Sequence, residues 1–164
     1  MRWTMRRTAR ARVLEVQVQY ALPRSGLPAA RTLHCAARAA WRGEGDAQVL
    51  LRLVDADEGA ELNHGFRGKC GATNVLSFPA SPEMHTAGGP RFLGDIVLCA
   101  PVLAKESLEQ QKTLGAHFAH MVVHGMLHLQ GMDHQNVAEA EAMETIERET
   151  LAGLGYGDPY EEIH

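Results

Sequence analysis

Cysteine is scarce in this sequence of 164 residues, and the three cysteines, Cys35, Cys70 and Cys99, lie far apart. An odd number of cysteines with no Cys-x-x-Cys pair argues against a disulfide framework and against a thiolate zinc site of the usual spacing. We therefore expect a reducing, cytoplasmic setting, in which all three cysteines act as small buried hydrophobic residues.

Long apolar runs and an excess of positive charge are also missing. No stretch approaches the roughly 20 apolar residues that span a bilayer, so no membrane contact is expected. The formal net charge of −4 argues against a uniformly basic coat for nucleic acids but permits a local basic groove. Arginines gather in Met1–Arg12 without a following apolar segment, so this start is not a secretory signal. It is predicted to be a poorly ordered tail, with a phosphate-binding arm as the alternative.

Hydrophobic periodicity predicts strands and helices that alternate early in the chain and helices only at its end. Strands are expected at 13–20, 48–54, 74–78 and 93–99, and helices at 31–41, 55–66, 101–111, 114–130 and 136–151. The segment 79–90, rich in proline and glycine, is expected to be a mobile loop. This order predicts one domain over 1–164 of the α/β (α+β) class, with about five helices packed on a small mixed sheet of about four strands.

Three histidines, His124, His128 and His134, fall within eleven residues. Positions i and i+4 of a helix share one face, so His124 and His128 can direct their rings at one point. Gly131 is expected to end the helix, after which the chain can bring His134 back to that point. Three imidazoles and one open position are the arrangement of a catalytic zinc site, although nickel, copper and iron also accept imidazole.

His117 and His120 lie on the same stripe of that helix. His120 is one turn before His124, about 6 Å along the helix axis, and so is badly placed to share a metal. Both are expected to be ordinary core or surface histidines. The alternatives are support of the ligands by His120 and a place near the mouth of a cleft for His117.

Gly125 distinguishes this helix from that of the zinc peptidases, whose His-Glu-x-x-His motif carries a general base beside the first histidine. Because glycine has no side chain, the peptidase mechanism lacks its base here. Asp133 is a substitute in principle, but it is better interpreted as a turn residue that orients a histidine or accepts hydrogen bonds from backbone amides.

Arg67, followed by a glycine and placed ahead of a buried strand, suits a different substrate. A guanidinium can clamp a phosphate and offset the charge that develops during phosphoryl transfer. An isolated arginine or lysine such as Lys69 is more often a solvated surface charge, so the hypothesis depends on the position of Arg67 relative to the histidines.

Three blocks of this sequence together resemble the YbeY family of bacterial endoribonucleases, also called rRNA maturation factors. The signature His-Gly-x-Leu-His-Leu-x-Gly-x-Asp-His is matched by 124–134. Leu-Asn-x-x-Phe/Tyr-Arg-Gly-Lys with Val-Leu-Ser-Phe-Pro is matched by 62–69 and 75–79, and Leu-Gly-Asp-Ile by 93–96. Cys70 and Asn74 depart from the acidic residues that are usual there, and Ala72 from a common proline.

The resemblance implies an enzyme that binds one zinc ion per chain through His124, His128 and His134. Arg67 would be its catalytic residue in the cleft. It also implies cleavage of single-stranded RNA, maturation of small-subunit rRNA near its 3′ end and a part in ribosome quality control. The ribosome and its proteins are then the expected partners, and DNA is not expected to be a substrate.

Two other functions remain as alternatives to the endoribonuclease. One is a ribosome-assembly factor that binds RNA and holds a mainly structural metal. The other is a zinc hydrolase of peptides or small molecules, which would need a general base in the cleft.

Overall fold

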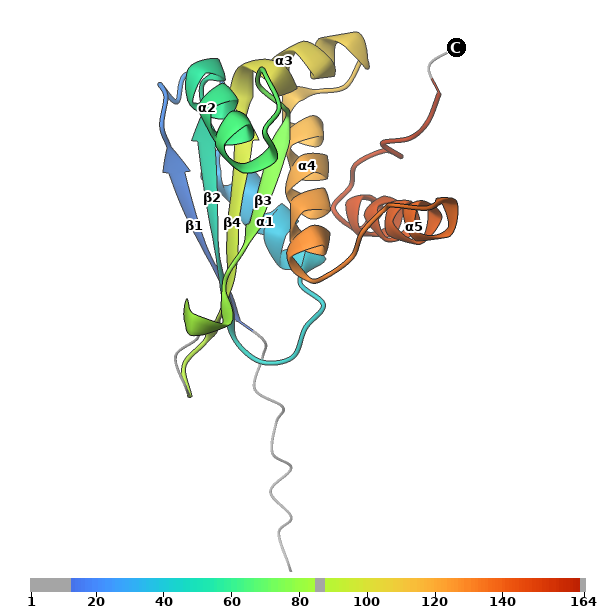
Figure 1. Cartoon of the computed structure of the whole chain (residues 1–164). Coiled ribbons are helices and arrows are strands. Elements are labelled where there is room, and N and C mark those ends of the chain that lie inside the picture. The colour runs from blue at the N-terminus through green and yellow to red at the C-terminus, as the bar shows by residue number, and fades with distance from the viewer. Residues whose placement is uncertain (1–12, 85–87, 163–164) are drawn as a thin grey trace, which may run out of the picture.

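Four strands form one mixed sheet at the centre of the molecule (Figure 1). The computed structural model describes residues 13–84 and 88–162, so the predicted tail Met1–Arg12 lies outside the described residues. The strands are β1 (Leu14–Tyr20), β2 (Ala47–Val54), β3 (Val75–Pro79) and β4 (Arg91–Cys99), in the order β1-β2-β4-β3. β1, β2 and β4 run parallel, and β3 pairs antiparallel with β4 at one edge.

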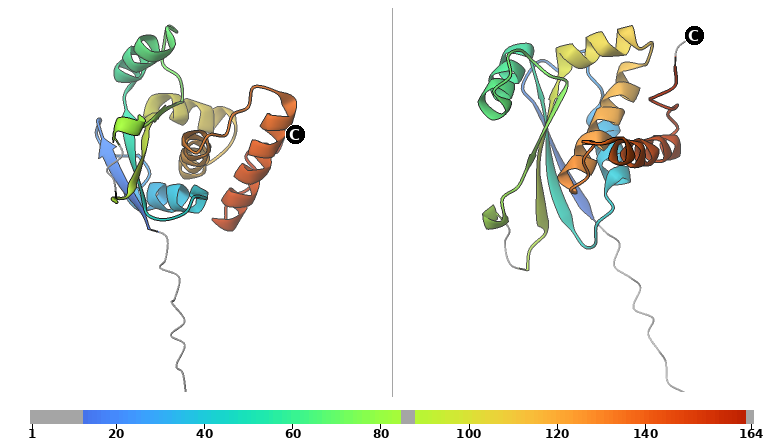
Figure 2. Two further views of the ribbon diagram at one scale, coloured as in Figure 1. Left: turned by 60° about the horizontal axis from the view of Figure 1, so that its bottom comes forward. Right: turned by 45° about the vertical axis from the view of Figure 1, so that its right-hand side comes forward.

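Helices cover both faces of this sheet (Figure 2). They are α1 (Ala30–Ala40), α2 (Ala56–Arg67), α3 (Ala100–Glu109), α4 (Leu114–Leu129) and α5 (Val137–Gly153), with a 3-10 turn at Pro82–Met84 inside the predicted loop. α1 and α4 pack on one face, α5 lies outside α4, and α2 lies on the opposite face. The predicted element order and the predicted α/β class with about five helices and four strands are confirmed.

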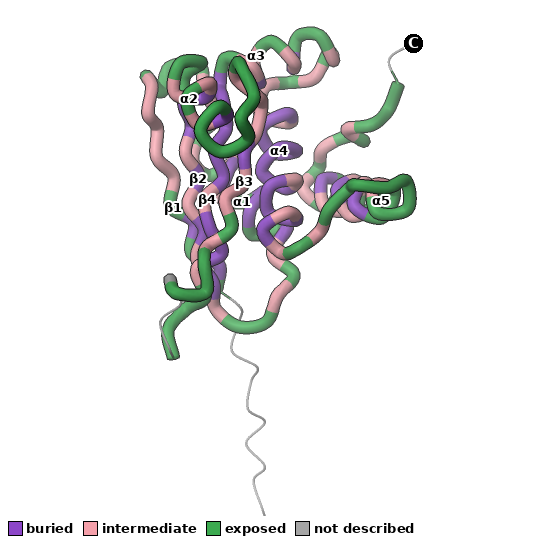
Figure 3. Tube along the Cα trace, in the orientation of Figure 1, coloured by how far each residue is buried: buried purple, intermediate pink, exposed green. Residues whose placement is uncertain are grey.

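The core lies between the sheet and the layer formed by α1 and α4 (Figure 3). In β1 the buried Leu14 and Val16 alternate with the exposed Glu15 and Gln17, which confirms the predicted strand with one wet face. A smaller apolar cluster lies on the other face, where Leu76 and Val97 are buried. α4 is buried almost all round because the sheet, α1, α3 and α5 all contact it.

Side-chain caps fix where the helices that carry the site begin. The backbone N–H of Glu58 donates to Asp55 Oδ1 at 2.9 Å at the start of α2, and that of Ala116 donates to Thr113 Oγ1 at 3.1 Å at the start of α4. Asn136 caps α5 in the same way, as its capping-box sequence predicts. β4 begins two residues before the predicted strand, at Arg91.

The cysteines differ from the prediction. Cys99 is buried, but Cys35 and Cys70 are exposed, so they are not small core residues. Cys35 is an exposed residue of α1, and Cys70 is an exposed residue of the loop after α2. No helix among the described residues is long and apolar enough to cross a membrane.

Gly94 is held at a point of close approach between β3 and β4. Its φ is +136°, and an added Cβ would lie 2.1 Å from the carbonyl oxygen of Phe78. Gly94→Ala is expected to lower the free energy of unfolding by about 2 kcal/mol or more, since both the backbone and the contact become strained. Urea denaturation measures this loss.

Gly65→Ala is the matched control, because Gly65 is helical and a Cβ there meets nothing within 4 Å. It should leave stability unchanged or raise it by up to about 1 kcal/mol. Equal effects of the two substitutions would show that the close approach at Gly94 does not constrain the fold.

Candidate metal centre

The second half of α4 places His124 and His128 on the side of the helix that faces the edge of the sheet near β3. α4 ends at Leu129, and Gly131 follows with a φ of +91°, as predicted for a residue just past a helix end. The turn returns His134 to the other two rings. The ring centroid of His134 lies 5.4 Å from that of His124 and 5.0 Å from that of His128.

The three imidazoles therefore form one cluster, which could hold a metal ion. One ligand nitrogen from each ring lies within 4.8 Å of the other two. His124 Nε2 and His128 Nε2 are 3.1 Å apart, and two nitrogens that bind one tetrahedral zinc ion at about 2.0–2.1 Å are about 3.3 Å apart. Burial lowers the pKa of His128, and the adjacent His124 and His134 lower it further, so its imidazole is neutral as a ligand must be. The spacing and the donor set thus suit one small cation.

Gly125 and Asp133 have structural roles beside these histidines. A Cβ at Gly125 would lie 2.9 Å from Ile96 Cγ2 and 3.2 Å from Ser77 Oγ, so the helix approaches β3 and β4 too closely for a side chain. The Asp133 carboxylate accepts from the backbone N–H of His134 at 2.8 Å. This confirms the interpretation of Asp133 as a turn residue.

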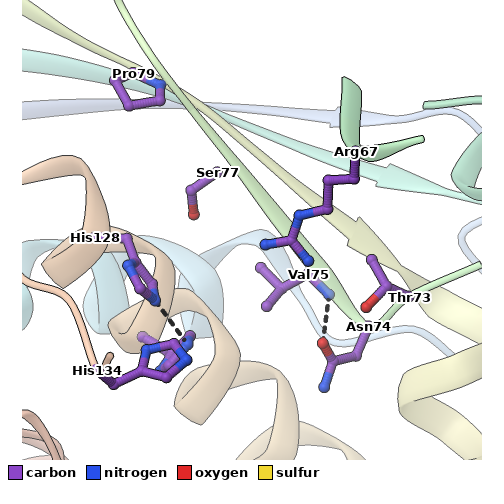
Figure 4. A pocket seen from close by; sticks show the side chains of 9 residues that line it. Arg67, Thr73, Asn74, Val75, Ser77, Pro79, His128 and His134 are labelled. Carbon is purple, nitrogen blue, oxygen red and sulfur yellow. Dashed lines mark hydrogen bonds between the residues drawn. The ribbon is translucent and has the colours of Figure 1, made fainter. Parts of the chain in front are cut away.

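Arg67 lies across the pocket from the histidines (Figure 4). It is the last residue of α2, and its guanidinium points from there over β3 toward the site. Within the described part of the chain this guanidinium has no hydrogen bond or ion pair of its own. The pocket has a volume of ≈ 310 Å³ and is lined by Arg67, Thr73, Asn74, Val75, Ser77, Pro79, His124, His128 and His134.

The structure adds a buried carboxylate that was not predicted from the sequence. Glu147 of α5 is fully buried and contacts His124. The signal was present in the sequence, because Glu147 lies at i+4 from Met143 and i−4 from Leu151, in the apolar stripe of the helix. Only the packing of α5 against α4 shows which histidines this carboxylate reaches.

His117 and His120 are both buried, so neither lies at the mouth of the cleft. His117 Nε2 is 3.2 Å from Glu106 Oε1, away from the metal cluster. His120 Nε2 is 2.9 Å from Glu147 Oε2. The prediction of a core histidine fits His117. His120 instead contacts Glu147, which also contacts His124, and this agrees with the alternative that His120 supports the predicted ligands.

Two of the buried groups, His117 and Glu147, and the half-buried His128 have shifted pKa values. Burial lowers the pKa of His117 more than Glu106 raises it, and burial also lowers that of His128. Burial alone would raise the pKa of Glu147, but hydrogen bonds from His120, His124 and Tyr160 outweigh it and lower the pKa to about 2. In each case the unfolded chain binds a proton at a higher pH than the folded protein does.

Acidification of the metal-free protein is therefore expected to lower the free energy of unfolding in two ranges of pH. Below about pH 6.5 the unfolded chain protonates His117 and His128, at a cost of at most about 1.4 kcal/mol per pH unit for each. Between about pH 4.5 and 2 the contribution of Glu147 is lost in addition. Urea denaturation at pH 7.5, 5.5 and 4 tests this, and a protein that is more stable at pH 5.5 than at 7.5 would contradict it.

Comparison with known proteins gives a consistent picture. Residues 29–155 match the family described as Endoribonuclease YbeY. A protein of that name from Stenotrophomonas maltophilia is 54% identical over 150 residues, which cover 90% of this chain and 93% of the relative. Another, from Xanthomonas axonopodis pv. citri, is 53% identical over 154 residues, which cover 92% and 96%.

A solved structure supports the fold. The solution structure of TM1509 from Thermotoga maritima is similar, with a TM-score of 0.54 and 24% sequence identity. The match covers 90% of this chain and 99% of that protein. At this identity the similarity applies to the arrangement of helices and strands alone.

Proposed function

This chain belongs to the YbeY family of endoribonucleases, and from that premise we propose that it cuts single-stranded RNA with the help of one bound metal ion. The observation that carries the proposal is the position of Arg67 opposite the histidine cluster in one pocket. A guanidinium without a partner among the described residues and a cluster of three imidazoles are the groups that hold a phosphate and a metal.

His124, His128 and His134 would hold the metal, with zinc as the ion that three imidazoles and an open position suit best. A metal bound there would supply a Lewis acid that polarises a phosphoryl oxygen or activates a nucleophile. The fold itself brings the three rings together, since α4 contacts the sheet, α1, α3 and α5, and the turn at Gly131 leads the chain back to His134.

Arg67 would bind the phosphate that is cut. Its planar guanidinium can donate two parallel hydrogen bonds to phosphate oxygens. It then offsets the extra negative charge of the transition state, where such a donor is worth more than in the ground state. In the free protein the side chain is exposed and has no partner among the described residues, so no internal contact has to break first.

The nucleophile would be the 2′-hydroxyl of the RNA or a water molecule. None of the residues that line the pocket is a carboxylate, and Glu147 is fully buried with its hydrogen bonds directed to other side chains. A route in which the RNA supplies its own 2′-hydroxyl as the nucleophile therefore fits this pocket best, because it needs no carboxylate in the pocket to activate water. Products that end in a 2′,3′-cyclic phosphate would support that route, and their absence in a trapped reaction would remove it.

The proposed cellular role is maturation of the 3′ end of small-subunit rRNA and ribosome quality control in the cytoplasm. The resemblance to the YbeY family supports this proposal, with the ribosome and ribosomal proteins as the proposed partners. Cells depleted of the protein should accumulate small-subunit rRNA precursors that keep their 3′ extension.

Two other functions fit the site less well. A mainly structural metal would favour a closed site, but His134 is exposed and the pocket is open to substrate. Peptide hydrolysis would need a base beside His124, where Gly125 leaves no room for a side chain. A casein assay with the zinc-loaded protein is expected to show no cleavage.

The test of the proposed function uses one RNA sequence in two forms. The zinc-loaded protein is expected to cut the single strand at least about tenfold faster than the same sequence in a duplex. The reason is that the pocket of ≈ 310 Å³ is at the lower end of sites that take one small ligand, and a flexible strand can present a single phosphate to it. Equal cleavage of both forms would contradict single-strand specificity.

A further inference from the structure

Glu147 is a carboxylic side chain in the interior of the protein. Its side chain lies between α5 and α4, in line with the core residues Met143 and Leu151, and is fully buried. A buried carboxylate is costly unless hydrogen bonds replace the water that it loses. The partners of Glu147 therefore indicate why a carboxylic side chain is placed there.

Both carboxylate oxygens of Glu147 are in use. Oε1 accepts from His124 Nδ1 at 2.6 Å. Oε2 accepts from His120 Nε2 at 2.9 Å and from the hydroxyl of Tyr160. Three donors from two further elements thus fix one side chain, and one of them is a residue of the metal cluster.

The contact with His124 sets the orientation of that ring. When Nδ1 carries the hydrogen that Glu147 accepts, the lone pair of a neutral imidazole is on Nε2. His124 Nε2 is the atom that lies 3.1 Å from His128 Nε2, on the side of the pocket. A carboxylate behind a ligand histidine also makes the ligand more basic.

Tyr160 brings the carboxy-terminal segment, residues 154–162, into contact with this carboxylate. Lys112 Nζ donates to the carbonyl oxygen of Pro159 at 2.6 Å. Asp158 accepts from Arg148 Nε at 3.2 Å and from the backbone N–H of Tyr160 at 2.8 Å. The two residues before Tyr160 thus bind the segment to α5 and to the turn before α4, and the segment lies on the side of α4 away from the sheet (Figures 1 and 2).

We propose that Glu147 is a positioning residue for the metal ligand His124, and that Tyr160 of the carboxy-terminal segment holds Glu147 in place. This inference deepens the proposed function, since it assumes that His124 binds the metal. It makes the segment after α5 part of the metal site, although no residue of that segment lines the pocket that contains Arg67.

The first experiment measures the affinity of the folded protein for Zn²⁺ in competition with a chelating dye. Glu147→Gln keeps the shape of the side chain but cannot accept from His120 and His124 with both of its ends. It is expected to weaken zinc binding by about 10- to 100-fold. Tyr160→Phe, which removes one of three donors, should weaken it by about two- to tenfold.

Matched controls separate positioning from general damage to the fold. Glu149→Gln alters an exposed glutamate of the same helix, and Tyr156→Phe alters a second tyrosine of the same segment. Both should bind zinc within about twofold of the wild type. A merely structural role would make Glu147→Gln easier to unfold while the folded fraction kept the zinc affinity of the wild type, and that result overturns the proposal.

The second experiment reads the tautomer of His124 directly, from the ¹⁵N shifts of the ring nitrogens in metal-free protein. The wild type should carry the hydrogen on Nδ1, and Glu147→Gln should move part of the population to Nε2. A wild type with the hydrogen on Nε2 overturns the inference. If His124→Ala left zinc affinity unchanged, the proposed metal site would fail instead, and the tautomer would still show whether Glu147 orients the ring.

Discussion

Arg67→Ala is expected to reduce the rate of RNA cleavage by about 10³-fold or more while the protein stays folded and keeps its metal. The guanidinium is exposed and has no hydrogen bond or ion pair within the described part of the chain, so its loss costs the fold little. Arginines that contact a phosphoryl group in transfer contribute about 10³ to 10⁵ in rate. The measurement is single-turnover cleavage of a labelled RNA, with zinc content determined on the same samples.

Lys69→Ala is the control for charge, since Lys69 is exposed two residues after Arg67 and does not line the pocket. It should lower the rate by less than about tenfold, and this loss should shrink at higher salt because the effect is long-range attraction. Arg67→Lys should recover only part of the rate, because an ammonium cannot make the paired hydrogen bonds of a guanidinium. Full activity of Arg67→Ala would remove Arg67 from the mechanism.

His128→Ala is expected to abolish tight metal binding and, with it, RNA cleavage. His128 is half-buried, and its pKa is lowered by burial and by the neighbouring histidines. Its Nε2 lies 3.1 Å from Nε2 of His124. Loss of a direct ligand should weaken zinc binding by more than the roughly 100-fold that loss of an outer partner costs. Competition with a chelating dye gives the affinity.

His34→Ala controls for the removal of a histidine as such, because His34 belongs to α1 and does not line the pocket. It should bind zinc and cut RNA like the wild type. If His128→Ala kept both properties, the three histidines would not be the metal site, whatever their spacing.

The elements of the fold could be predicted because each of them carries a local pattern. The alternation of apolar and polar residues from Leu14 to Tyr20 predicts a strand over the same residues. The capping residues Asp55 and Asn136 stand directly before the helices that they begin. Strand order depends on contacts between distant segments, and no local pattern gives the insertion of β4 between β2 and β3. The exposure of Cys35 and Cys70 depends in the same way on which face of each element meets the sheet.

The candidate site likewise has a part that local sequence predicts and a part that only tertiary packing determines. His124, His128 and the turn at Gly131 are close in sequence, so helix geometry alone brings their rings together. The position of Arg67 opposite them depends on the end of α2 and on β3, which the resemblance indicated but the spacing did not. Glu147 and Tyr160 come from the last helix and the segment after it, and only packing brings them to His124 and His120.

The central claim is that the histidine cluster holds the metal that RNA cleavage requires. It is tested most directly by adding zinc in steps to metal-free protein and measuring cleavage of a defined single-stranded RNA at each step. Metal-free protein is expected to leave the RNA intact, and the rate should rise in proportion to bound zinc, up to one ion per chain. Cleavage at full rate by protein shown to contain no metal would contradict it.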